Sequence, residues 1–150
     1  RTEVVSEQCL HLLFDVFFFL FGIRSLEPDL SAHRSPIEDH IRTDVRGTFV
    51  EIINSDYEWR SVNGGRMKKD AVMGNHYHKK ITAFFYILEG EAMVEIWKKG
   101  KPKKSYRIRT NQGIFFMPYE IHTMTFLKPS TYLLLKDYKF NEKAKDIFIK

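Results

Sequence analysis

The sequence predicts an all-β protein, an antiparallel barrel that follows an N-terminal extension. From residue 47 onward, short runs rich in Val, Ile, Phe and Tyr recur at close spacing, which is typical of strands. Gly, Pro, Asn and Asp stand between these runs, where chain reversals need them. Helical periodicity is almost absent from this part. Seven or eight short strands without helices indicate a sandwich or a closed barrel.

The composition fits one domain of this kind. The chain has 150 residues, of which 43% are hydrophobic, enough to bury a core and to exclude disorder of the whole chain. A single cysteine, Cys9, excludes an internal disulfide framework. The formal net charge is +5, and basic residues gather in segment 98–109. No recognition helix or zinc-finger spacing accompanies them, so we expect no nucleic-acid partner.

Residues 1–44 form the expected N-terminal extension. Its apolar run 9–23 (CLHLLFDVFFFLFGI) is 15 residues long, shorter than the roughly 20 residues of a membrane span. No basic segment with a cleavage site frames it as a signal peptide. We therefore expect a cytoplasmic protein without a membrane partner, in which a homodimer buries the apolar run. Residues 24–44 contain Pro28 and Pro36 and are expected to be a connecting segment.

Residues 45–140 are expected to form the barrel, and residues 141–150 a weakly helical tail. Gly64 and Gly65 are expected to form a turn, as are segments 98–104 (KKGKPKK) and 111–113. The expected strands are 49–54, 66–73, 83–89, 92–97, 105–109, 114–117, 122–127 and 131–138.

Three histidines are the strongest chemical signal in the sequence. His76 and His78 are two residues apart in an expected strand, so their side chains share one face. Pro118 fixes a turn before His122, which begins a later strand. If His122 and Phe126 face inward, all three imidazoles meet inside the barrel.

Two segments resemble the conserved motifs of the cupin superfamily. Residues 74–90 (GNHYHKKITAFFYILEG) resemble the first motif, and residues 113–122 (GIFFMPYEIH) resemble the second. The resemblance implies a cupin jelly roll whose histidines bind a metal or a substrate. Ala83 stands where the family has its metal-binding glutamate. Three neutral imidazoles can still hold a divalent metal (Zn, Fe, Ni or Cu). The expectation is therefore either no cofactor or a metal at His76, His78 and His122.

A narrower resemblance concerns the ketoisomerase/epimerase-like cupins of nucleotide-sugar and surface-polysaccharide pathways. Residues 45–51 (VRGTFVE) and the segment 74–90 resemble these enzymes, although Met73 stands where the ketoisomerases usually have arginine. The resemblance implies an isomerase or epimerase in which His76 or His78 removes a proton beside a ketone. Imidazole suits this role because its ordinary pKa is about 6.5. The resulting enolate needs a donor or a cation nearby.

The remaining expectations concern the substrate. We expect a small molecule, in particular a nucleotide sugar, as the partner. Two alternatives stay open: a metallo-cupin that acts on a small organic substrate, and a non-catalytic ligand-binding cupin. Glu120 is expected to face solvent. The residues expected to bind substrate are Arg66, Lys80, Tyr86 and Tyr119.

Overall fold

The computed structural model describes residues 36–38, 40–139, 141–143 and 145–149. These residues form twelve strands and no helix, which confirms the all-β prediction for this part of the chain. None of them forms a helix long and apolar enough to cross a membrane. The apolar run 9–23 and its expected dimer contact lie outside the described residues.

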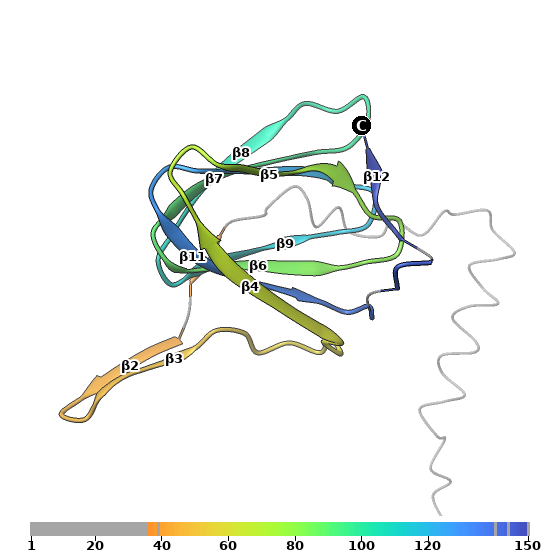
Figure 1. The fold of residues 1–150 in the computed structure, drawn as a ribbon. Helices are drawn as coiled ribbons and strands as arrows, with labels where there is room; N and C mark the ends of the chain where they lie inside the picture. Colours follow the sequence, from red (N-terminus) through yellow and green to blue (C-terminus); the bar gives the residue numbers. More distant parts are fainter. Residues whose placement is uncertain (1–35, 39, 140, 144, 150) are drawn as a thin grey trace, which may run out of the picture. The chain divides into compact units, whose positions relative to one another are not determined.

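Two five-stranded antiparallel sheets face each other and form the barrel (Figure 1). The first sheet contains, in spatial order, β1 (Ile37–Glu38), β9 (Gln112–Phe116), β6 (Ala83–Glu89), β11 (Ser130–Lys136) and β4 (Ser61–Met67). The second contains β12 (Phe148–Ile149), β5 (Val72–Tyr77), β10 (Ile121–Phe126), β7 (Glu91–Trp97) and β8 (Lys104–Arg109). From β4 to β12 the chain changes sheet at every connection except that between β7 and β8. This connectivity is that of a jelly roll.

The core lies between the sheets and follows the two-residue period of a strand. On β6, Phe85 and Ile87 face the main core between the two sheets, and both are fully buried. Phe84 and Tyr86 alternate with them and belong to a second cluster on the outer face of this sheet, with Leu135 and Trp59. Because residues 83–87 of β6 are buried on both faces, their sequence AFFYI is apolar without interruption.

The region expected to be one strand at 66–73 is the end of β4, a turn and the start of β5. The expected turn at Gly64 and Gly65 is instead the middle of β4. A β-carbon on Gly64 would lie 3.0 Å from the carbonyl oxygen of Tyr132 and 3.1 Å from the Leu133 side chain, both on β11, so this glycine allows β4 and β11 to approach closely. The reversal occurs at residues 68–71, where Asp70 has a φ of 65°.

Both ends of the described chain contain strands that the sequence did not reveal. The expected connector 24–44 includes β1 and β2 (His40–Asp44), and β2 pairs with β3 (Gly47–Glu51) in a separate hairpin. The expected domain boundary after residue 44 falls in the turn of this hairpin. The tail expected to be weakly helical contains β12, which pairs with β5. A helix of about ten residues is marginal on its own, whereas the edge of β5 offers backbone hydrogen bonds.

Gly90, in the turn between β6 and β7, provides a test of this packing. Its φ is +105°, and an added β-carbon would lie 2.2 Å from Oγ of Ser130 and 2.6 Å from the carbonyl oxygen of Pro129. We expect Gly90→Ala to lower the free energy of unfolding by about 3 kcal/mol, through backbone strain and overpacking. Gly100→Ala is the matched control, because Gly100 also has a positive φ (+75°) but open space around it. It should cost about 1 kcal/mol. Equal losses in equilibrium denaturation would contradict the packing argument.

Candidate functional site

A β-bulge in β5 turns His76 toward the inside of the barrel. His76 pairs with His122 of β10, while Gly74 pairs with the next residue of β10, so Asn75 is the extra residue of β5. Gly74 and Asn75 have φ values of 98° and 59°, a conformation that glycine and asparagine tolerate. The bulge shifts the alternation by one position. His76 therefore faces inward, as does Met73, which packs on the main core.

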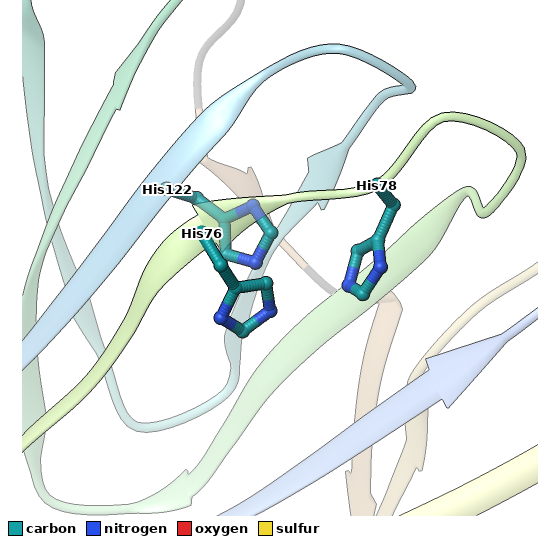
Figure 2. Close-up of side chains that lie close together, drawn as sticks. All are labelled: His76, His78 and His122. Atoms are coloured by element: carbon teal, nitrogen blue, oxygen red, sulfur yellow. The ribbon is translucent and has the colours of Figure 1, made fainter. Parts of the chain in front are cut away.

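The three predicted histidines form one cluster (Figure 2). The ring centroid of His76 is 4.9 Å from that of His78 and 4.8 Å from that of His122. The potential ligand nitrogens of all three lie within 4.8 Å of one another. His78 and His122 are each only 3% exposed, whereas His76 is half-buried. His76 is thus the member of the cluster that a ligand can reach most directly.

Backbone carbonyl groups fix the tautomer of each imidazole. A carbonyl oxygen only accepts hydrogen bonds, so the Nδ1 atom that faces it carries the proton and Nε2 has the lone pair. Three Nε2 lone pairs are therefore available inside the barrel. The Nδ1 donors and their carbonyl acceptors are His76 to Gly74 (3.1 Å), His122 to Glu120 (3.1 Å) and His78 to Asp146.

The imidazoles are neutral at neutral pH. Burial is the main cause that lowers the pKa of all three, and it lowers the pKa of His122 to about 3. The positive charge of Lys136 lowers each of these pKa values further. The hydrogen bonds to the carbonyl groups act in the opposite direction but do not offset burial. A neutral imidazole is the form required both of a general base and of a metal ligand.

Lys136 is a pocket residue that the sequence reasoning missed. It ends β11, in which Leu134 packs on the main core and Leu133 and Leu135 belong to the outer cluster. Alternation therefore places Lys136 on the inner face. It is half-buried, and burial lowers its own pKa. The alternation of Tyr132, Leu134 and Lys136 was the signal available in the sequence.

Ala83, at the position of the family's glutamate, lies between Lys136 and Phe116. It pairs with Lys136 across β11 and with Phe116 across β9. The Phe116 ring stacks on His122, with centroids 4.2 Å apart and an interplanar angle of 3°. The position thus carries a methyl group, beside an aromatic ring and an ammonium group. The three nitrogens fit a divalent metal as donors, and position 83 adds no carboxylate to offset its charge. The metal stays a prediction.

Two of the residues expected to bind substrate lie at the same end of the barrel as His78. Tyr119 donates its backbone N–H to the carbonyl oxygen of His78 at 2.6 Å, and its side chain is 59% exposed. Lys80, two residues after His78, is exposed. Both side chains are free to meet a ligand at this end, so their role stays a prediction.

The structure does not bring Arg66 and Tyr86 to the histidines. Tyr86 is fully buried in the outer cluster, where its hydroxyl donates to Oδ1 of Asn111 at 3.4 Å. Arg66 precedes Met67, which packs on the inner core, so Arg66 lies on the outer face of β4 and is exposed. In both cases the alternation of the strand points the side chain away from the pocket.

Glu120 does not face solvent as expected, because its residue is only 2% exposed. Its Oε2 accepts the backbone N–H of Met117 at 2.9 Å. The carboxylate thus closes the turn around Pro118 from the inside and holds the start of β10 in place. This gives it a structural role next to His122, whose Nδ1 donates to the Glu120 carbonyl oxygen.

The C-terminal segment 145–149 forms hydrogen bonds with the residues that follow β5, the strand of His76. The Asp146 carboxylate accepts the backbone N–H of Lys79 at 3.1 Å and that of Lys80 at 2.8 Å, while its carbonyl group binds His78. In β12, Phe148 stacks on Tyr77 with centroids 5.3 Å apart. No local pattern in the sequence indicates this contact, because 68 residues separate His78 from Asp146.

The fold matches known structures, although no family model and no curated protein matches the sequence. A 3,4-ketoisomerase from Helicobacter canadensis is 20% identical, with a TM-score of 0.67, over 77% of this chain and 90% of that one. The sugar 3,4-ketoisomerase QdtA from Thermoanaerobacterium thermosaccharolyticum, in complex with TDP, is 18% identical with a TM-score of 0.67, over 77% and 87%.

A third match has a longer chain. The RmlC epimerase of Mycobacterium tuberculosis is 18% identical, with a TM-score of 0.64, over 72% of this chain. The matched part spans 64% of that epimerase. At sequence identities of 18–20%, the similarity to these three structures shows the fold alone. The chain has the cupin jelly-roll fold, as the two sequence motifs predicted.

The neutral histidines make stability depend on pH. The unfolded chain binds protons at these histidines near pH 6.5, but folded His122 does so only near its pKa of about 3. The free energy of unfolding should therefore fall as the pH drops below about 6.5. The contribution of His122 alone should rise from about 0.7 kcal/mol per pH unit at pH 6.5 toward about 1.4 kcal/mol per pH unit at pH 5. Denaturation between pH 6.5 and 5 isolates this effect from carboxylates, and His122→Asn should show a shallower slope. An unchanged slope would contradict neutral burial.

Asp146→Ala tests the clamp formed by the C-terminal segment. Loss of hydrogen bonds from two backbone N–H groups to a charged acceptor should lower the free energy of unfolding by about 1–3 kcal/mol. It should also broaden the NMR signals of the His78 ring, because β12 would detach more often. Glu142→Ala is the matched control, an exposed carboxylate in the same segment. If both variants behave alike, the clamp contributes nothing.

Proposed function

We propose that this protein is an isomerase or epimerase of a nucleotide-linked sugar, with His76 as the general base. One observation carries the proposal. His76 combines a proton on Nδ1, fixed by the Gly74 carbonyl oxygen at 3.1 Å, with an Nε2 lone pair in a half-buried position. Its lowered pKa keeps it neutral at the pH of a cell. His78 and His122 have the same tautomer but are much more deeply buried.

The chemistry follows from this geometry. Nε2 of His76 takes the proton from the carbon beside a ketone, and the electrons of that C–H bond form an enolate. For an isomer to form, the proton of the neighbouring hydroxyl moves to the former ketone oxygen, the C=O bond forms at the carbon that lost its proton, and His76 gives its proton to the former ketone carbon. For an epimer to form, a second donor on the opposite face protonates the carbon, and His76 releases its proton to solvent. The hydrogen bond from Nδ1–H to the Gly74 carbonyl oxygen steadies the imidazolium while it holds the proton. Substrate binding must therefore bring the acidic carbon within about 3 Å of Nε2.

The fold neighbours support the class of substrate. QdtA binds TDP in one structure, and a variant of it binds TDP-4-keto-6-deoxyglucose in another. Lys80 and Tyr119 are suited to meet a diphosphate and a base or sugar ring, respectively, at the end of the barrel near His78. Such a substrate agrees with the cytoplasmic location expected from the sequence. A non-catalytic cupin would bind the same ligand without moving a proton.

Deuterium exchange measures the proposed step directly. We expect the protein to bind TDP or UDP in calorimetry, and to incorporate deuterium from D₂O beside the ketone of a dTDP-4-keto-6-deoxy sugar. His76→Asn should slow the exchange by about 10²- to 10⁴-fold, the usual contribution of a general base. Nucleotide affinity should change little, because the diphosphate is bound elsewhere.

Tyr77→Phe is the matched control, because Tyr77 is adjacent on β5 but stacks on Phe148, away from the pocket. It should exchange at the wild-type rate. Absence of binding by either nucleotide at millimolar concentration would refute the proposal. Binding without exchange in the wild-type protein would leave a ligand-binding cupin in its place.

A further inference from the structure

Lys136 places a cation beside a set of nitrogens that otherwise suits a metal. We propose that its ammonium group takes the place of a metal ion in this pocket. It keeps divalent cations away from the three imidazoles, and it makes the pocket a site for an anionic or carbonyl oxygen. The binding of an anionic or carbonyl oxygen rests on the proposed function, whereas the exclusion of divalent cations does not.

The register of three neighbouring strands supports this assignment. Ala83 is the common neighbour, since it pairs with Lys136 on one side and with Phe116 on the other, and Phe116 stacks on His122. Lys136 is thus two strands away from the residue that covers His122. Its charge acts on all three imidazoles. Alternation in β11 places Lys136 on the inner face of the barrel, which is also the face of the histidine cluster.

The charges around the pocket favour an anion over a cation. The three imidazoles are neutral and Ala83 contributes no carboxylate, so Lys136 gives this group a net charge of about +1. The negative charge of Asp146 raises the pKa of His78 alone, whereas the charge of Lys136 lowers the pKa of all three histidines. The Asp146 carboxylate accepts backbone N–H groups of residues 79 and 80, and that of Glu120 accepts the N–H of Met117. Within the described residues, the Lys136 side chain forms no ion pair or hydrogen bond. Its three N–H donors are therefore available to a ligand oxygen.

A divalent ion at the three nitrogens would be repelled by this charge in a partly desolvated place. Repulsion there is several times stronger than at the surface, because the effective dielectric constant is lower. Without a carboxylate ligand, nothing in the set offsets it. The same field attracts the oxygen of a ketone as it gains negative charge, which is the group that the proposed reaction creates.

Metal titration tests the exclusion without any sugar. Untagged protein, stripped with chelator, is titrated with Ni²⁺ or Co²⁺ by calorimetry, and the Co²⁺ spectrum reports nitrogen ligation. We expect weak binding by the wild type. Lys136→Met should bind at least about tenfold more tightly, a gain of about 1.4 kcal/mol, with a new Co²⁺ absorption band. Lys136→Arg keeps the charge and should remain weak. Lys101→Met, in the β7–β8 turn, removes the same charge elsewhere and should match the wild type.

Two results would overturn the inference: stoichiometric micromolar binding by the wild type, or equal affinities in the wild type and Lys136→Met. Lys136→Gln repeats the comparison if the methionine variant does not fold. The outcome is separable from that of the proposed function. Tighter metal binding in Lys136→Met, together with no deuterium exchange in the wild type, would retain metal exclusion and reject the isomerase.

Discussion

The extra residue of β5 opposite β10 decides which side chains face the inside of the barrel. Without Asn75 as a bulge, the alternation that turns Met73 inward would turn His76 outward, away from His122. The bulge depends on two consecutive residues with positive φ. A β-carbon on Gly74 would lie 2.6 Å from the carbonyl oxygen of His122. The strand that carries His76 and leads to His78 thus packs closely on the backbone of His122, so the site depends on the pairing of β5 with β10.

Short-range pattern was enough to predict the barrel and the histidine cluster. Alternation placed His76 and His78 on one face, and Pro118 with the following strand placed His122. These inferences need only the period of a strand and the conformation of proline. They failed where a glycine had a packing role: a β-carbon on Gly64 would lie 3.0 Å from the carbonyl oxygen of Tyr132, a residue more than sixty positions away. The pair Gly64-Gly65 therefore predicts a turn unless the neighbouring strand is known.

Lys136 and Asp146 show what short-range sequence patterns could not predict. The inner position of Lys136 follows from alternation in β11, but its closeness to the histidines follows from the order of β9, β6 and β11 in the sheet. That order joins segments far apart in the chain, and no local pattern contains it. Asp146 reaches the histidine strand only because β5 has an open edge that β12 fills. Tyr86 shows the reverse case: its strand is buried on both faces, so apolar composition could not indicate which face meets the pocket.

Burial of the imidazoles does not by itself choose between a base and a metal ligand, because both need the neutral form with its Nδ1 proton fixed by a carbonyl group. The charges around the imidazoles determine whether they act as a base or as metal ligands. A carboxylate at position 83 would lower the cost of bringing in a divalent ion, whereas a methyl group there leaves the Lys136 ammonium unopposed across the strand. With that ammonium group in place, a neutral substrate that develops negative charge is stabilised and an ion that arrives with positive charge is not. In the proposed assignment, Ala83 on β6 and Lys136 on β11, two strands that contribute no histidine, thereby decide what the three histidines can do.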